Sequence, residues 1–456
     1  MEREDTTYLA RNDEDGSINL IELALGLDAD AALKTALTAL HPADFSDQLE
    51  QLSAEQRAEL VIRAPDLISG EVLTELEDEV VEDILPLLPS DKLAVALTDC
   101  DHNDATQIIE EMEAVQREDV LGALTREDRA ALEDALTFDD ETIGRLMQRE
   151  FVAAPEFWSV GDTIDHMRET GDALPEQFYN IYVIDAAFKP LGYVPLSRLM
   201  RSSRDMKLAQ LMTDELVIIT QDQDQEDAAY LFEKYNLISA PVVNAAGRLV
   251  GMMSVDDIIE IIQDENKEDI LALAGVSDAG LTDTALSTVK ARAPWLFVNL
   301  LTAVLASLVI AQFDYAISQI VALAVLMPIV ASMGGNAGTQ ALAVAVRALA
   351  ERDLTSQTAW RAVRREAVAA SIIGLIFAIV LALIAYLWFG DERLAFAAFV
   401  AMIINHIFAG LAGILIPLGL KRAGADPAVA SSVFVTTVTD VTGFLAFLGF
   451  AALILF

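Results

Sequence analysis

The sequence predicts a multidomain membrane protein, with an all-α cytosolic superhelical domain, a pair of α/β repeats and an α-helical transmembrane domain of five spans. Three observations predict it: apolar residues at helical spacing near the N-terminus, an internal repeat in the middle, and five long apolar stretches near the C-terminus. Charge divides the chain in the same way. The chain has 71 acidic and 30 basic residues, of which eight acidic and ten basic residues lie from Leu286 onward. The net charge of −41 therefore comes from the residues before Leu286.

Residues 1–138 are expected to form an acidic helical domain whose first ~18 residues are disordered. Between residues 20 and 140, the apolar positions are interrupted by "HPAD", "RAPD", "LPSD" and "LTREDR", which are typical helix starts. The acidic N-terminus has no apolar core of a signal peptide. Cys100 is the single cysteine, so an intramolecular disulfide is excluded. The strong negative charge argues against a nucleic-acid partner and favours cations.

Residues 139–262 contain the repeat. "IYVIDAAFKPLGYVPLSRL" (181–199) aligns without a gap on "APVVNAAGRLVGMMSVDDI" (240–258). Each unit reads as a strand, a helix, a strand, a turn, a strand and a helix. One unit of this size buries little core, so the two are expected to pack as a pair.

Residues 263–289 are expected to connect the repeats to the membrane, as part of a helix that begins within "VDDIIEIIQDENKEDILALAG". Carboxylates at 257, 260 and 264 and at 265, 268 and 269 share adjoining helix faces, where like charges repel. Bound divalent cations would relieve that repulsion. A solvated acidic face and adaptation of the whole chain to high salt are the two other interpretations.

Residues 290–456 are predicted to hold five membrane-spanning helices. Basic residues precede the first apolar stretch and fill the second and fourth loops, whereas the first loop has none and the third only Arg393. By the positive-inside rule the acidic part is cytoplasmic and the C-terminus is outside. The apolar stretches are 293–313, 317–346, 367–389, 394–419 and 428–455.

Asp440 lies midway along the fifth stretch, in "VTTVTDVTG". A charge at the bilayer centre costs at least ~2.5–3.5 kcal/mol on insertion scales, so an intramembrane carboxylate indicates an ion path. Ser432 and Thr436 share its helix face at i−8 and i−4. The alternative is a structural carboxylate hydrogen-bonded to a neighbouring helix. His406, in "IINHIFAG", is the other deep ionisable group and is interpreted as a packing residue.

The second stretch carries "MPIVASMGGNAGTQA". Pro328 removes a helical donor, and three closely spaced glycines weaken a helix or let backbones approach. Asn336 and Gln340 lie one turn apart on one face. The pattern predicts a helix broken at membrane depth, whose carbonyls line a cavity with Asn336.

These hard oxygen ligands suit Mg²⁺, Ca²⁺ or Mn²⁺, and the residues themselves do not choose among the three. Mg²⁺ is commonly held through its water shell by one or two carboxylates, which fits one Asp440 in each chain. In a two-fold dimer, two such residues could face one pore.

The repeats resemble cystathionine-β-synthase-type (CBS) domains, which often bind adenine nucleotides. In that family, a Ser/Thr-x-x-Asp after the last strand contacts the ribose. The second repeat keeps it as Ser254 and Asp257, and the first has Pro195 and Arg198 instead. The resemblance therefore implies ATP or another adenine nucleotide at Ser254 and Asp257, or a dimerisation scaffold that binds none.

The whole chain resembles the MgtE-type magnesium channel/transporter family, with "GGNAGTQ" and "TDVTG" matching its pore motifs. The resemblance implies no enzyme, but a homodimer in the cytoplasmic membrane that imports Mg²⁺ and is closed by cytosolic Mg²⁺ acting on a connecting "plug" helix. The pore residues implied by the resemblance are Asp440 and Thr436, and the polar helix faces described above add Ser432 and Asn336. The implied cytosolic sensor residues are Asp224, Glu226, Asp257, Glu260, Glu265, Glu268 and Asp269.

Three rival functions remain. The first is a transporter for Mn²⁺, Co²⁺ or Ca²⁺. The second is an intramembrane aspartyl protease, which would need two facing carboxylates where each chain supplies only Asp440. The third is a nucleotide sensor with a membrane anchor.

Overall fold

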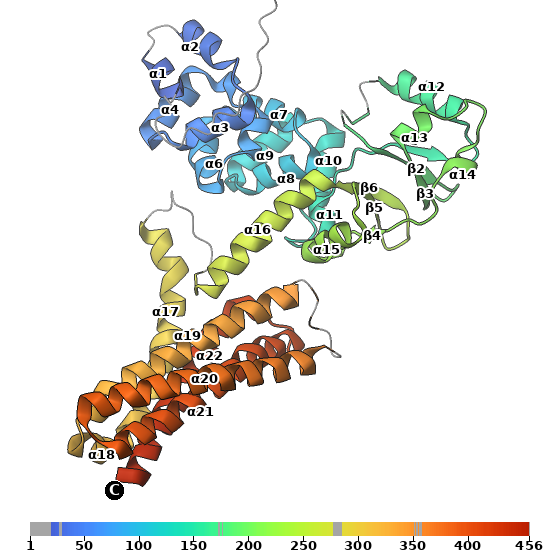
Figure 1. Ribbon diagram of the computed structural model, residues 1–456. Coiled ribbons are helices and arrows are strands. Elements are labelled where there is room, and N and C mark those ends of the chain that lie inside the picture. Colours follow the sequence, from blue (N-terminus) through green and yellow to red (C-terminus); the bar gives the residue numbers. More distant parts are fainter. Residues whose placement is uncertain are drawn as a thin grey trace, which may run out of the picture. The chain divides into compact units, whose positions relative to one another are not determined.

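The computed structural model describes residues 20–455 except 27–29, 172–173, 176, 277–284, 351, 353 and 355–357. The expectation of disorder over the first ~18 residues lies outside this described part. The chain divides into two compact units, Met1–Ile262 and Gln263–Phe456, and each is described by itself. Figure 1 labels most of their helices and strands.

Short helices build the N-terminal part of the first unit, around a core of Leu, Ile and Val side chains. The predicted starts hold for "HPAD", "LPSD" and "LTREDR", whereas "RAPD" gives only a 3₁₀ turn, Pro65–Leu67. Thr125 caps α10 by accepting a hydrogen bond from the Asp128 amide. The helices are α1 (Leu20–Leu25), α2 (Asp30–Leu37), α3 (Pro42–Glu50), α4 (Ala54–Arg63), α5 (Gly70–Thr74), α6 (Asp78–Ile84), α7 (Ser90–Thr98), α8 (His102–Glu110), α9 (Ala114–Ala123) and α10 (Arg126–Ala135).

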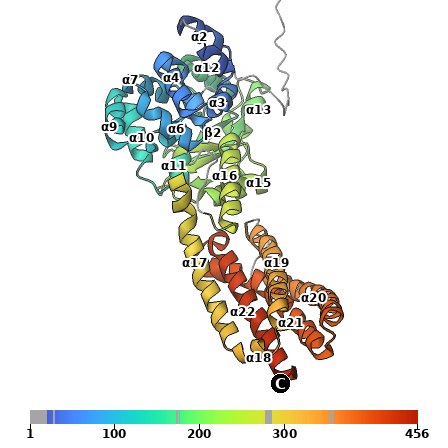
Figure 2. The same cartoon turned by 90° about the vertical axis from the view of Figure 1, so that its left-hand side faces the viewer.

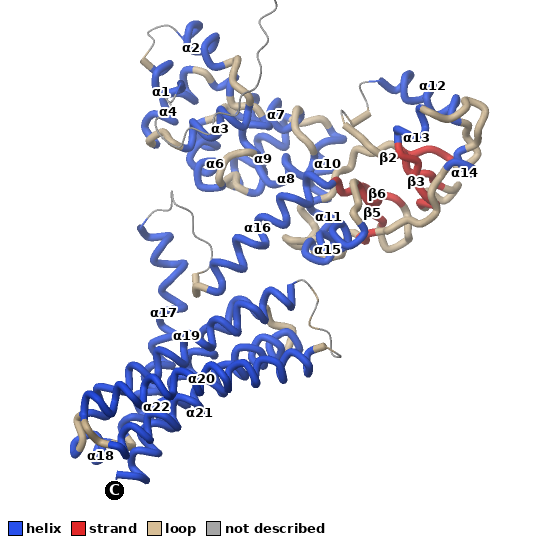
Figure 3. The backbone as a smooth tube through the Cα atoms, viewed as in Figure 1, coloured by secondary structure: helices blue, strands red, loops and turns tan. Residues whose placement is uncertain are grey.

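The two repeats each form a three-stranded sheet, whose strands are red in Figure 3. In each sheet the first pair of strands is parallel and the second pair is antiparallel. The hairpin turns match. The Asp185 carboxylate accepts hydrogen bonds from two backbone amides of its turn, and the Asn244 side chain does the same in the second repeat. The elements are α11 (Ile143–Leu146), β1 (Ala153–Pro155), α12 (Val160–Thr170), β2 (Asn180–Ile184), β3 (Pro190–Pro195), α13 (Leu196–Met200), α14 (Leu208–Leu211), β4 (Ile219–Thr220), α15 (Gln225–Tyr235), β5 (Ser239–Val243), β6 (Leu249–Ser254) and α16 (Val255–Leu273).

The repeats pack against each other, as the sequence predicts. Tyr182 and Ile184 of β2 share a buried cluster with Leu249 and Met252 of β6. The Tyr182 hydroxyl also donates a 2.9 Å hydrogen bond to Ser239 of β5. This joint core supplies the apolar burial that one small repeat would lack.

The described residues of the second unit form five helices that are long and apolar enough to span a membrane: α17, α19, α20, α21 and α22. Helix α17 packs along α22, and α19 to α22 form the tighter bundle (Figure 2). The short α18 precedes α19. The bounds are α17 (Ala285–Ala311), α18 (Asp314–Gln319), α19 (Ala322–Ala350), α20 (Ala359–Phe389), α21 (Glu392–Arg422) and α22 (Pro427–Leu455).

Candidate functional site

Helix α22 carries the intramembrane carboxylate. Ser432, Thr436 and Asp440 share one face of it and are all partly exposed, whereas Val435 and Thr439 are buried. The Thr436 hydroxyl donates a 2.9 Å hydrogen bond to the Ser432 carbonyl. Within the described part of the chain, the Asp440 carboxylate takes part in no hydrogen bond or ion pair. A structural carboxylate would be bonded to a neighbouring helix, so the geometry favours the ion-path interpretation.

The predicted break in the second span is wrong, because α19 is one continuous helix with Pro328 inside it. Pro328 lies in the second turn, where its missing N–H affects a carbonyl close to the helix start. The glycines serve close packing instead. A Cβ on Gly338 would lie 2.6 Å from Cγ1 of Val435, so this glycine lets α19 and α22 touch. Asn336 is exposed on the same helix, and its role in the pore stays a prediction.

His406 lies in α21 and is buried, with its ring stacked on Phe377 at 6.1 Å between centroids. Its Nδ1 lies 3.0 Å from the Met402 carbonyl, and its Cβ fills the space left by Gly374 of α20. These contacts agree with the packing interpretation. Sequence reasoning passed over the neighbouring Asn405, which is fully buried in the bundle. A buried amide in an apolar span was the signal that could have found it.

In the first unit, carboxylates of α8 and α16 come together. The Asn103 side-chain amide donates to Asp104 Oδ1 at 3.0 Å and to Asp257 Oδ1 at 3.1 Å. Burial, together with Asp101, Glu260 and Asp257, raises the pKa of Asp104 to about 7. Burial also raises the pKa of Asp257. The buried Oδ1 of Asn103 has no hydrogen-bond partner, so an unpaired acceptor lies beside two carboxylates. This arrangement suits a hard cation.

Asp257 is also held by the second repeat. It accepts hydrogen bonds from the Ser254 amide at 3.0 Å, from the Ser254 hydroxyl, and from Nε2 of Gln148 at 3.1 Å. The pair that would bind a ribose is therefore engaged within the protein. Asp104 was absent from the sequence prediction, because only the fold places α8 beside α16.

The other predicted sensor residues are spread over two helices. Asp224 is the N-cap of α15 and accepts from the Glu226 amide at 2.9 Å, and both side chains are exposed. Among the described residues, no three His, Cys, Asp or Glu side chains form a ready metal site. The role of these predicted residues in sensing cytosolic Mg²⁺ stays a prediction. On α16, Glu260 and Glu268 are exposed, and Glu265 and Asp269 are partly buried.

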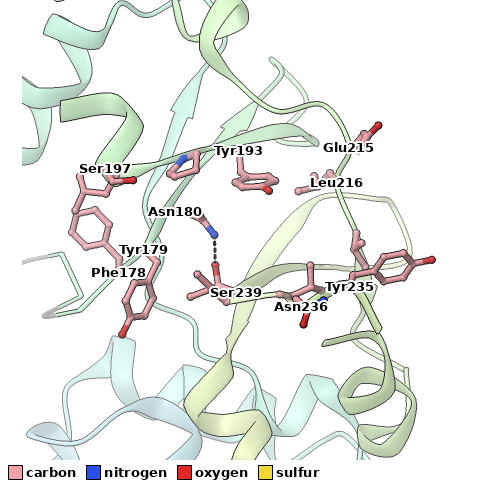
Figure 4. A pocket seen from close by; sticks show the side chains of 15 residues that line it. Phe178, Tyr179, Asn180, Tyr193, Ser197, Glu215, Leu216, Tyr235, Asn236 and Ser239 are labelled. Carbon is pink, nitrogen blue, oxygen red and sulfur yellow. Dashed lines mark hydrogen bonds between the residues drawn. The ribbon is translucent and has the colours of Figure 1, made fainter. Parts of the chain in front are cut away.

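A cavity of about 520 Å³ lies between the two repeats (Figure 4). Asn180 donates a 2.9 Å hydrogen bond to Ser239 across it. Among the described lining residues, Glu215 is the one charged group. The Nη1 atom of Arg198 donates hydrogen bonds to the Leu211 carbonyl and to the Thr213 hydroxyl, each at 3.1 Å. Pro195 also lines this cleft, and its described lining residues include no Lys or Arg that could pair with a phosphate.

Comparison with known proteins identifies three regions. Residues 327–450 match the sequence model of the MgtE family, described as a divalent cation transporter. Residues 40–141 match the MgtE intracellular N domain, and residues 208–264 match a CBS domain.

Two relatives are similar along nearly their whole length. The magnesium transporter MgtE of Thermus thermophilus is 31% identical, over 93% of this chain and 95% of its own. The magnesium transporter MgtE of Bacillus subtilis is 28% identical, over 92% and 93%. A crystal structure of the cytosolic domain of the Mg²⁺ channel MgtE in complex with ATP is 26% identical, with a TM-score of 0.49, and covers 53% of this chain and 98% of that one.

Proposed function

Because the chain belongs to the MgtE family of magnesium transporters, we propose that it imports Mg²⁺ through a path at Asp440 and that cytosolic Mg²⁺ closes this path. A transporter of this family is a membrane protein of a non-enzymatic kind, and the five long apolar helices agree with several membrane crossings. The observation that carries the proposal is the Asp440 carboxylate on the partly exposed face of α22, which takes part in no hydrogen bond or ion pair with the described residues.

One carboxylate suits a hydrated ion. Mg²⁺ gives up its water reluctantly and is held by few protein ligands, so Asp440 would bind it through its water shell. The hydroxyls of Thr436 and Ser432 on the same face would contact that shell, and Asn336 of α19 would add an amide oxygen. In a homodimer, a second Asp440 would share the ion and reduce the free energy of placing each charge in the membrane.

Closure is proposed to begin at the acidic cluster of Asp104 and Asp257. Without Mg²⁺ the two carboxylates would repel, and Asp257 is one of the acidic groups that add to burial in raising the pKa of Asp104. A bound Mg²⁺ would hold α8 to α16, with Asn103 Oδ1 as a further oxygen ligand. The remaining carboxylates of α15 and α16, including Glu226 and Glu265, would bind further ions in the same way.

Helix α16 would transmit ion binding at the Asp104 and Asp257 cluster to the membrane helices. It carries Asp257 near its start, and in the second unit its end residues Ala272 and Leu273 pack with Val346 of α19 and Val435 of α22. Val435 directly precedes Thr436. A displacement of α16 would therefore disturb α22 one turn from Asp440, which makes this helix a two-state element biased by a ligand.

The loop charges support the proposed orientation, with the N-terminus in the cytoplasm and the C-terminus outside the cytoplasmic membrane. A homodimer is proposed because the Asp440 face and much of α17 are left uncovered by the rest of the described chain.

A nucleotide at the CBS pair is a second, weaker proposal, supported by the retained Ser254 and Asp257. A ribose hydroxyl would have to replace the Gln148 amide on Asp257. Calorimetry of the full chain with ATP tests it, and absence of heat with an unchanged Mg²⁺ response would support the scaffold interpretation.

Uptake into vesicles tests the proposed function. Purified protein is reconstituted, and Mg²⁺ entry is followed with an internal dye while Mn²⁺, Co²⁺ or Ca²⁺ competes outside. We expect Mg²⁺ to enter at low internal Mg²⁺ and uptake to stop when internal Mg²⁺ is high. Strong inhibition of Mg²⁺ entry by equal concentrations of the competing ions would favour a general divalent transporter, and uptake independent of internal Mg²⁺ would contradict the gating.

A further inference from the structure

Asn405 connects three helices of the second unit. Its Nδ2 donates a 2.8 Å hydrogen bond to the Val330 carbonyl of α19. Its Oδ1 lies 3.2 Å from the Thr442 hydroxyl of α22. A carbonyl can only accept, so the amide nitrogen must face Val330 and the oxygen must face Thr442. With no exposed surface, Asn405 is positioned to act on its neighbours and not on an ion directly.

The amide occupies the space between two glycines, one in each predicted pore motif. A Cβ on Gly334 of α19 would overlap the Asn405 side chain, and one on Gly443 of α22 would lie 2.8 Å from its Nδ2. Glycine is therefore required at both positions as long as Asn405 stays in place. The three residues form a joint that fixes how α19 and α22 meet.

This joint lies within one turn of Asp440. Thr442 and Gly443 follow Asp440 by two and three residues, and α22 is continuous through all of them. Any shift along or rotation about the α22 axis that breaks the joint therefore moves the Asp440 carboxylate. A hydrated ion is bound by few direct ligands. The affinity of the path for Mg²⁺ would therefore depend on the position of the Asp440 carboxylate.

We propose that Asn405 is a positioning residue for ion conduction, which sets the height and rotation of α22 against α19 and thereby the place of the Asp440 carboxylate. The inference rests on the proposed function of Asp440. An apolar residue of similar volume would fill the same space without bringing an amide into the membrane. The two polar contacts, and not the volume, are what the amide adds.

The test compares variants that separate volume from hydrogen bonding, in vesicles with equal amounts of inserted protein. Asn405→Leu keeps the number and branching of the side-chain heavy atoms, in a somewhat larger side chain, and removes both contacts. The double variant Asn405→Ala and Gly334→Ala removes the Asn405 amide and places the new methyl group of residue 334 in the space that the amide leaves. Thr442→Val is the mildest change, since the Thr442 proton is shared with the Val438 carbonyl at 2.6 Å. Each variant is measured for maximal uptake, half-saturating Mg²⁺ concentration and preference for Mg²⁺ over Ca²⁺.

We expect Asn405→Leu and the double variant to raise the half-saturating Mg²⁺ concentration by roughly tenfold and to lower the preference for Mg²⁺, because two buried polar contacts are lost. Thr442→Val should shift both in the same direction by roughly two- to threefold. Unchanged half-saturation and preference, with maximal uptake falling only as inserted protein falls, would show a purely structural residue and overturn the inference.

Asp440→Asn, measured beside them, separates the two proposals. If it abolishes uptake while the Asn405 and Thr442 variants keep the wild-type half-saturation, the positioning inference alone fails. If Asp440→Asn takes up Mg²⁺ normally, the proposed function fails.

Discussion

The side chain of Asn103 on α8 donates a 3.1 Å hydrogen bond to the Asp257 carboxylate on α16, across 154 positions of sequence. The same amide nitrogen holds Asp104. A neutral donor thus separates two carboxylates whose pKa values are both raised, in each case first by burial. The contact leaves an excess of negative charge that a divalent cation would neutralise.

Removing one charge of this cluster should reduce the response to internal Mg²⁺. In Asp104→Asn, repulsion at low Mg²⁺ is weaker and the ion has one ligand fewer at high Mg²⁺, so the difference in uptake between the two conditions should shrink. Vesicle uptake at low and high internal Mg²⁺ measures it. Asp119→Asn removes an exposed carboxylate of α9 in the same domain and should respond like the wild type. An equal response of all three proteins would exclude Asp104 from closure.

The pH dependence has a defined sign. Asp104 titrates at about 7 in the folded unit and at 3.8 in an ordinary environment, so the folded state binds more protons between these values. Its stability without Mg²⁺ should therefore fall as pH rises from about 4 to 7, by up to ~4 kcal/mol, and level off above.

Hydrogen exchange of peptides covering α8 in the full chain, corrected for intrinsic rates, measures this loss between pH 5 and 8. The groups acting on Asp104 are Asp101, Glu260, Asp257 and Asp256. Asp104→Asn should flatten the profile, whereas the Asp119→Asn control should keep it. A wild-type profile that is already flat would be inconsistent with the raised pKa.

Protons and Mg²⁺ should compete at the same carboxylate. A metal ligand must be deprotonated, so the internal Mg²⁺ concentration that halves uptake should rise as pH falls from 8 to 6, by up to roughly tenfold per pH unit below the pKa. Vesicle uptake at fixed external pH measures this midpoint. A midpoint independent of internal pH would place the controlling ion elsewhere.

Much of the fold follows from local sequence patterns. The gapless repeat predicted two matching units, and the turns at Asp185 and Asn244 have the same hydrogen bonds. Apolar length predicted the spans, since a helix must be long enough to cross the hydrocarbon core. The continuity of α19 did not follow, because Pro328 and the glycines allow either a break or close packing, and only the neighbouring Val435 and Asn405 decide between them.

The candidate site residues also divide into those that local sequence patterns predict and those that only the fold brings together. Asp440 and Asp257 were recognisable from helix spacing and motif. Asp104 and Asn405 were not, because their significance lies in partners that are distant along the chain: Asp257 is 153 positions from Asp104, and Val330 and Thr442 are 75 and 37 positions from Asn405. Patterns within a single sequence do not show which distant residues will lie beside each other in the fold.

Two glycines of the motif in α19 should differ sharply on substitution. A Cβ at Gly338 would lie 2.6 Å from Val435, whereas at Gly335 nothing lies within 4 Å. Gly338→Ala should destabilise the bundle by about 1–3 kcal/mol through overpacking, and Gly335→Ala, its matched control, should not. Thermal unfolding of the full chain in detergent measures both, and equal melting temperatures would contradict the close approach of α19 and α22.

The central claim is that Asp440 is the membrane site for the ion, and uptake by Asp440→Asn tests it most directly. This variant keeps the size of the side chain and removes the charge, while Asp440→Glu keeps the charge one methylene further out. With equal insertion confirmed for each protein, we expect Mg²⁺ uptake to fall to the level of empty vesicles in Asp440→Asn and to persist, at reduced affinity, in Asp440→Glu. Uptake by Asp440→Asn at the wild-type rate would contradict the account.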